Sequence, residues 1–399
     1  MLHMDLGRAR KLMRERGIDV LVSNTEDNVY YASGYKDWMA GWCPILAIIP
    51  ADATLSPAMI CSDFLEVQVK QKTYITDVRT YPLWMPIVDV EDLKKGTAVA
   101  KERPKQFMEE LVFQLFSDII AEKGLKAGVI AVESSLLKNQ QSVSIMTKLN
   151  PKIRLVEGDD LFWDLRKIKT EAEIKYIRIA ASLGAKGLEA VIEDDLRGVS
   201  MGELHLRYNR GIWDAASADN AMDLKNVRLN ISAGEHFATM ENPGYCVSEG
   251  DMIWVDNGVT VFGYTSDMGR TFSVGKPTEL QRGIFETIKE GYEKAVSLVK
   301  PGVQMKEIFL TLQETVHQKG YNWYARGHMG HSVGIGRTEQ PPFITPEEQT
   351  VLEPNMVICV ECGLYTLGKF GAVQIEDMFF VTPSGHELLT PLSRDMVEL

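Results

Sequence analysis

The chain has 399 residues, of which 45% are apolar and 25% are charged, as is usual for a globular protein with a large core. Its formal net charge of −12 argues against nucleic acid or an anionic membrane as a partner. An odd count of five cysteines does not suggest a disulfide framework, and no apolar run approaches the roughly 18 residues of a membrane span. We expect a cytoplasmic protein with two domains.

The N-terminal part of the chain alternates between helical and extended patterns. The spacing of its apolar residues predicts amphipathic helices over 6–16 and 107–123. Short apolar runs bounded by turn residues predict strands over 19–23, 44–50, 57–61 and 127–133. Thr170 and Glu173 then form a capping box at the start of a new helix. These patterns predict an α/β domain over 1–160 and a second domain over 161–399.

The second domain contains an internal repeat. "GVSMGEL" at 198–204 recurs as "GVQMKEI" at 302–308, and a capped helix precedes each copy. A strand that carries a carboxylate follows each copy, with Asp256 in the first half and Glu361 in the second. A further extended segment then carries another carboxylate, Asp267 or Glu376. We therefore expect an α+β domain with a pseudo-twofold repeat that brings two matched pairs of carboxylates together.

These four carboxylates lie in strands that are otherwise apolar. Burying four unpaired carboxylates would cost several kcal/mol each. Two divalent cations would neutralise them, and oxygen donors with one imidazole suit Mn²⁺, Co²⁺, Fe²⁺ or Zn²⁺, among which we favour manganese. For a single acid, an ion pair with a nearby arginine such as Arg270 is the alternative. Four acids at matched positions favour the metal.

His331 is the natural nitrogen ligand for such a centre. Gly330 and Gly334 stand close to it in the sequence and allow a close approach of the backbone. Among the other histidines, His236 and His328 are weaker candidates for the same pocket.

Cys359 and Cys362 form a C-x-x-C pair, which could indicate a zinc or redox site. The alternation of side chains along a strand places Cys359 on the same face as Glu361 and Cys362 on the opposite face. We therefore favour packing as the role of both cysteines.

The order of these candidate ligands resembles that of the pita-bread metallohydrolases, which include methionine aminopeptidase, aminopeptidase P and prolidase, with creatinase as a metal-free relative. The segments "LRKIKTEAEIKYIRIA" at 165–180 and "NVYYASGY" at 28–35 are similar to parts of the prolidase and creatinase branch. The resemblance covers almost the whole chain. It implies a creatinase-like N-terminal domain, a pita-bread catalytic domain and a homodimer.

The same resemblance implies a role for each ligand. Asp256 would bind one metal ion, and Asp267 and Glu376 would bridge two ions. His331 and Glu361 would bind the second ion. A hydroxide held between the ions would then be the nucleophile. We expect Glu361 to carry its proton to the leaving nitrogen.

The chain departs from the peptidases of this family around the expected substrate. These peptidases place a histidine seven residues after the metal histidine, where this chain has Thr338. They carry another histidine before the first metal strand, and "FATMENPG" at 237–244 has none. Gln374 stands where an arginine is common, and neither Thr nor Gln carries a positive charge. Four residues near His331 are candidates to take over the roles of these missing groups, namely Tyr324, Arg326, His328 and Arg337.

An aromatic loop in the N-terminal domain, "YKDWMAGW" at 35–42, is a further candidate. In the prolidase and creatinase branch, this domain approaches the active site of the dimer mate. Tyr35, Trp38 and Trp42 are therefore candidate substrate contacts, with packing at the domain interface as the alternative.

Three hypotheses follow for the function. The first is a two-metal C–N hydrolase that resembles Xaa-Pro dipeptidase and acts on a dipeptide. The second is the same fold acting on a small non-peptide metabolite, as creatinase, ectoine hydrolase and some dimethylsulfoniopropionate lyases do. The third is a binding protein without catalysis, which the retention of all five ligands disfavours.

Overall fold

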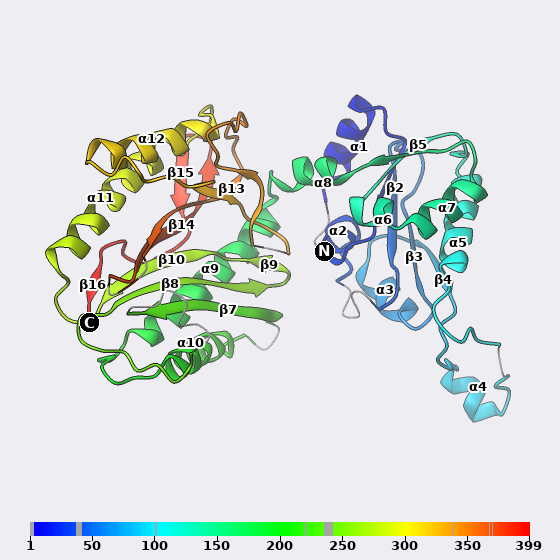
Figure 1. Cartoon of the computed structure of the whole chain (residues 1–399). Coiled ribbons are helices and arrows are strands. Elements are labelled where there is room, and N and C mark those ends of the chain that lie inside the picture. Colours follow the sequence, from blue (N-terminus) through cyan, green and yellow to red (C-terminus); the bar gives the residue numbers. More distant parts are fainter. Residues whose placement is uncertain are drawn as a thin grey trace. The chain divides into compact units, whose positions relative to one another are not determined.

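The computed structural model divides the chain into two compact units, Met1–Leu165 and Arg166–Leu399 (Figure 1). The residues it describes are 4–36, 42–99, 102–219, 222–234, 242–336, 338–366, 368 and 370–399. The division lies close to the boundary near 160 expected from the capping box. No helix in these ranges is both long and apolar enough to cross a lipid bilayer.

The first unit is an α/β domain built on one sheet. Over the described residues the sheet has six strands in the order β4-β3-β2-β1-β5-β6, and only the pairs β1–β2 and β2–β3 are antiparallel. The strands are β1 (Val20–Ser23), β2 (Leu46–Pro50), β3 (Ala58–Ser62), β4 (Asp77–Tyr81), β5 (Val129–Val132) and β6 (Arg154–Glu157). The helices are α1 (Leu6–Glu15), α2 (Glu26–Ser33), α3 (Glu66–Lys72), α4 (Val90–Lys95), α5 (Glu109–Glu122), α6 (Ser134–Lys138), α7 (Gln140–Leu149) and α8 (Asp159–Arg166). The helices and strands predicted here from periodicity are therefore confirmed.

The second unit is built on a curled, largely antiparallel sheet. Its main path runs β12-β11-β13-β14-β10-β8-β7, while β15, β16 and β9 pair at the sides. The strands are β7 (Leu224–Ala233), β8 (Met252–Val261), β9 (Tyr264–Thr265), β10 (Met268–Ser273), β11 (Gly330–Ser332), β12 (Gln340–Phe343), β13 (Val357–Tyr365), β14 (Ala372–Thr382), β15 (Gly385–Leu388) and β16 (Val397–Glu398). The helices are α9 (Glu171–Val191), α10 (Met201–Ala216), α11 (Glu279–Val296) and α12 (Met305–Gln318).

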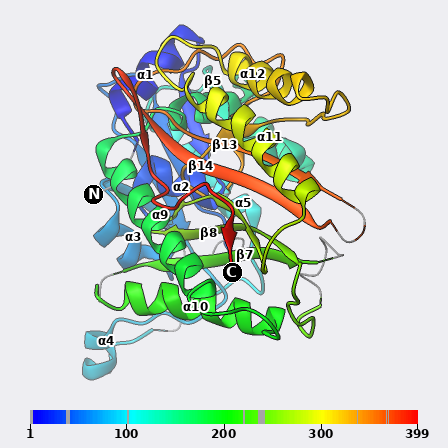
Figure 2. The same cartoon turned by 90° about the vertical axis from the view of Figure 1, so that its left-hand side faces the viewer.

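The two halves of this unit repeat one arrangement. In the first half α9 and α10 pack on β8 and β7, and in the second half α11 packs on β13 and β14 while α12 packs on α11 (Figure 2). Each half begins with a capping box at the position expected, Thr170 with Glu173 in α9 and Thr278 with Gln281 in α11.

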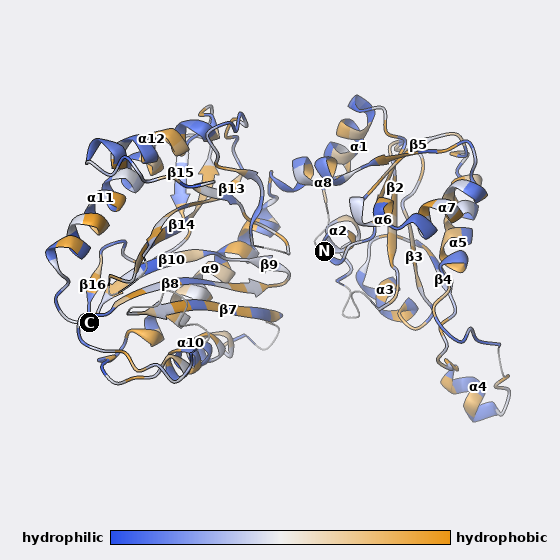
Figure 3. Ribbon diagram, in the orientation of Figure 1, coloured by the Kyte–Doolittle hydropathy of each residue, from blue (hydrophilic) through white to orange (hydrophobic). Residues whose placement is uncertain are grey.

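Each half also buries its own apolar core. The helices carry apolar residues on one side and polar residues on the other, while the central strands are largely apolar (Figure 3). Tyr208 of α10 and Ile231 of β7 belong to the first core, and Tyr292 of α11 and Val360 of β13 to the second. The predicted α+β domain with an internal repeat is therefore confirmed. The pairing of β10 with β14 joins the two halves in one sheet.

Candidate metal centre

The strand register places the acidic residues in one row across the sheet. Asp256 of β8 lies opposite Gly269 of β10, which lies opposite Glu376 of β14, which in turn lies opposite Glu361 of β13. Residues that are directly opposite in neighbouring strands point to the same face of a sheet. Asp267 comes two residues before Gly269 and shares that face. The repeat therefore brings all four acids to one side of the sheet.

His331 reaches this face from the neighbouring strand β11. Gly330 before it has φ of +136°, and a Cβ there would lie 2.1 Å from the carbonyl oxygen of Cys359, so a glycine is required at this position. The imidazole Nε2 lies 3.5 Å from Oδ2 of Asp267 and 3.8 Å from Oε1 of Glu376. Its Nδ1 lies 3.1 Å from the Ser332 carbonyl, which can only accept, so Nδ1–H donates and Nε2 faces the acids.

Four donor side chains form an inner pocket at this point. The donor atoms of Asp267, His331, Cys359 and Glu376 all lie within 4.8 Å of one another, and all four residues are buried. Cys359 belongs to this pocket although the sequence favoured a packing role for it. The signal was its place two residues before Glu361 on the same face, but its closeness to His331 depends on the pairing of β11 with β13.

The chemistry of the inner pocket fits a divalent cation. Burial, reinforced by the neighbouring Asp256, raises the pKa of Asp267 well above its usual range, and burial with Asp267 does the same for Glu376. Burial lowers the pKa of His331, which favours the neutral ring that a metal needs. The hydrogen bond from Nδ1 to a backbone carbonyl is the usual support of a ligating histidine. An ion would remove the cost of holding the carboxylates together.

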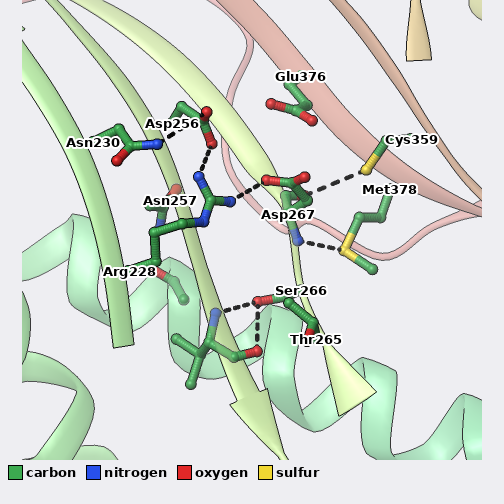
Figure 4. A network of polar contacts seen from close by, with 12 residues as sticks. Arg228, Asn230, Asp256, Asn257, Thr265, Ser266, Asp267, Cys359, Glu376 and Met378 are labelled. Atoms are coloured by element: carbon green, nitrogen blue, oxygen red, sulfur yellow. Dashed lines mark hydrogen bonds and ion pairs between the residues drawn. The ribbon is translucent and has the colours of Figure 1, made fainter. Parts of the chain in front are cut away.

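Asp256 and Asp267 share an arginine that the sequence reasoning missed. Nη1 of Arg228 donates to Oδ1 of Asp256 and Nη2 donates to Oδ1 of Asp267, both at 2.5 Å (Figure 4). Burial lowers the pKa of Arg228, but the two aspartates outweigh this and raise it above its usual range. Arg270, the partner considered from the sequence, instead pairs with Asp377. In the sequence Arg228 is only one of several charged residues in the stretch "DLKNVRLNIS" at 223–232.

Glu361 lies outside the inner pocket and pairs with a second arginine. Nη2 of Arg326 donates to Oε2 of Glu361 at 2.7 Å, and Nδ1 of His328 lies 3.2 Å from Oε1. Both are among the substitutes sought from the sequence. Arg326 and His328 also line an open cavity of about 380 Å³, together with Trp323, Tyr324 and Tyr365. Two residues that contact the Glu361 carboxylate, Arg326 and His328, thus line this cavity.

Gln374, which stands where an arginine is common, contacts the carboxylate of Glu376. Its Nε2 donates to Oε2 of Glu376 at 3.0 Å, and its Oε1 accepts from the Tyr365 hydroxyl. A Cβ at Gly269 would lie 2.8 Å from the Gln374 side chain, so the glycine in the acidic row leaves room for this amide.

The other predicted substrate contacts lie outside this cluster or outside the described residues. Thr338 is partly buried beyond β11. Tyr35 is buried within the first unit, and Trp42 there is 71% exposed. Trp38, Arg337 and His236 fall among the residues that the structure does not describe. Their contact with a substrate stays a prediction.

Comparison with known proteins gives one consistent family. Residues 175–383 match metallopeptidase family M24, and residues 6–168 match the creatinase/prolidase N-terminal domain. The Xaa-Pro dipeptidase of Pyrococcus furiosus is 33% identical over 97% of each chain, and that of Pyrococcus horikoshii is 27% identical over 97% of each chain. The crystal structure of the prolidase from Pyrococcus horikoshii OT3 is 25% identical, with a TM-score of 0.76 over 98% of this chain and 99% of that one. The chain therefore belongs to the M24 metallopeptidases and is a metal-dependent hydrolase with the pita-bread fold.

Proposed function

We propose that the chain is a dipeptidase that cleaves the C–N bond of Xaa-Pro dipeptides. The observation that supports this most is the inner pocket, where His331, Asp267 and Glu376 converge as buried donors in a chain whose full length matches relatives named Xaa-Pro dipeptidase. An ion bound there supplies Lewis-acid polarisation of an amide carbonyl and a nucleophilic water at neutral pH. Asp267, His331 and Glu376 are the residues that would hold it.

Glu361 is the proposed proton carrier of the reaction. It lies on the same face of the sheet as the inner pocket and opposite Glu376 in the register. Its carboxylate accepts a hydrogen bond from Arg326. A carboxylate in this position accepts the proton of the attacking water and donates it to the leaving nitrogen. Arg326 fixes the orientation of Glu361 during both transfers.

The cavity beside Glu361 is the proposed substrate site. Its volume of about 380 Å³ lies within the range of small-ligand pockets. The aromatic side chains of Trp323, Tyr324 and Tyr365 give it apolar walls that suit a proline ring. His328 stands at the boundary between this cavity and Glu361, where its ring can donate a hydrogen bond to the carbonyl of the scissile bond.

A second candidate function rests on Gln374 and Thr338. The amide of Gln374 is engaged by Glu376 and Tyr365, so this position offers no positive charge to a peptide. Thr338 likewise stands where peptidases of the fold place a histidine, and its hydroxyl cannot carry a positive charge. A small non-peptide substrate with a C–N bond, such as a cyclic amidine or a urea, would not require either group.

A substrate panel distinguishes the two functions. The full chain, loaded with Mn²⁺, is assayed with Xaa-Pro dipeptides, with matched dipeptides that lack proline, and with cyclic amidines, ureas and betaine-like compounds. We expect turnover of the Xaa-Pro dipeptides alone. Turnover confined to a non-peptide compound would replace the first function by the second, and no turnover of any compound by the metal-loaded chain would contradict both.

A further inference from the structure

The guanidinium of Arg228 lies where a cation shared by Asp256 and Asp267 would lie. Its two terminal nitrogens bind one oxygen of each aspartate at 2.5 Å (Figure 4). We propose that Arg228 takes the place of one of the two metal ions expected from the ligand order, so that the chain holds a single divalent ion in the inner pocket. This inference rests on the proposed hydrolase function and changes the composition of its metal centre.

The backbone around Arg228 is shaped to deliver its side chain. Strands β7 and β8 shift their register between Lys225 and Arg228, and Asn226 within this shift has φ of +47°. A bulge of this kind redirects the side chain that follows it. Beyond the bulge Arg228 lies opposite Gly258, where a Cβ would lie 3.1 Å from Nη2 of the arginine and 2.2 Å from the Ser266 carbonyl oxygen. The glycine thus leaves room for the guanidinium as well as for the backbone.

The donor atoms themselves separate into one compact group and two outlying acids. Among the described residues, the only group of metal donors that comes together consists of Asp267, His331, Cys359 and Glu376. Asp256 and Glu361 lie outside it, and each has an arginine as partner, Arg228 or Arg326. The described residues therefore form one complete site for an ion. The other two carboxylates, Asp256 and Glu361, are paired with arginines.

The charges of the centre agree with a single ion. Four carboxylates carry four negative charges, and Arg228 and Arg326 supply two positive ones. One divalent ion brings this set to neutrality. A second ion would have to displace Arg228, which would give up two charge-assisted hydrogen bonds. The proposal therefore predicts that a second ion binds only when Arg228 is removed.

The test is the metal content of the full chain. Chelator-treated protein is saturated with Mn²⁺, freed of excess by gel filtration and analysed for manganese per chain. We expect one ion in the wild type, two in Arg228→Met and one in Arg210→Met, which removes an exposed arginine of α10 as a matched control. Electron paramagnetic resonance should show an isolated Mn²⁺ ion in the wild type and a coupled pair in Arg228→Met.

Asp256→Asn keeps the proposal testable if Arg228→Met fails to fold. A two-ion centre loses an ion when Asp256 is removed, whereas the single-ion centre keeps its one ion. Two ions in the wild type, the loss of an ion in Asp256→Asn, or a single ion in folded Arg228→Met would each overturn the role of Arg228. Two ions in the wild type would leave the hydrolase function standing, whereas a wild type that binds no ion at all would refute that function itself.

Discussion

The two halves of the C-terminal unit share a backbone plan but differ in the cations around their acids. In the first half Asp256 and Asp267 are joined by Arg228 of the adjacent strand. In the second half Glu376 faces the imidazole of His331, while Glu361 is bound by Arg326. The register keeps the acids in one row in both halves. The repeat thus preserves the position of each carboxylate on the sheet, while the residues around it determine whether it pairs with an arginine or faces an imidazole.

The largest effect is expected from Glu361→Gln in the second half. The amide keeps the shape of the side chain but cannot accept a proton, so kcat should fall by about 10²–10⁴-fold. Manganese content should stay unchanged, because Glu361 lies outside the inner pocket. Steady-state kinetics and elemental analysis check the two statements. Glu353→Gln, at an exposed position, is the matched control, and near-normal kcat in Glu361→Gln would remove Glu361 from the mechanism.

His331→Ala should separate metal binding from the fold. The loss of a direct nitrogen donor should weaken Mn²⁺ binding by more than about 100-fold, since even the residues that support a ligand contribute 10–100-fold. Isothermal titration of the chelator-treated chain with MnCl₂ measures the change, and His205→Ala on α10 controls for the loss of a histidine. Unchanged affinity in His331→Ala would place the ion elsewhere.

Gly330→Ala tests the backbone approach that delivers His331. The new Cβ would meet the Cys359 carbonyl, and φ of +136° is strained for alanine, so the free energy of unfolding should fall by at least about 1–3 kcal/mol. Urea denaturation measures this loss. Gly283→Ala in α11 is the control, because a Cβ there meets no atom within 4 Å. Equal stability of the two variants would show that β11 can move away from β13.

Glu173→Gln is expected to have the smallest effect. The substitution makes the capping box of α9 the same as that of α11, where Gln281 stands at the matching position. Burial raises the pKa of Glu173, so above its usual pKa the folded chain binds more protons than the unfolded chain. The stability of the wild type therefore falls as the pH rises from the usual pKa of a glutamate to the raised pKa of Glu173 in the folded chain. The stability of Glu173→Gln does not change for this reason. The difference between them should therefore grow in favour of Gln as the pH rises above the usual pKa of a glutamate.

Denaturation at several pH values measures this difference. Gln281→Glu is the reciprocal variant and should acquire the pH dependence that Glu173→Gln loses. A difference between Glu173→Gln and the wild type that is independent of pH would mean that Glu173 titrates alike in the folded and unfolded chain.

Much of the fold and the gathering of the four acids on one face of the sheet could be predicted from local patterns, while the partners of the acids could not. The capping boxes, the repeat and the glycine before His331 are local signals, and each has the expected structure. Arg228 reaches the acids through a register shift between β7 and β8, which no local pattern shows. Cys359 joins the inner pocket only because β11 pairs with β13. Pairing between strands distant in the chain was the missing information.

The position of the ion is tested most directly by X-ray diffraction from crystals grown with Mn²⁺, using the anomalous signal of manganese. The structure predicts a single anomalous peak among Asp267, His331 and Glu376, with the Arg228 guanidinium still between Asp256 and Asp267. A peak between those two aspartates, with Arg228 turned away, would contradict the single-ion centre. The absence of any peak at the acidic row would contradict the metal-dependent mechanism as a whole.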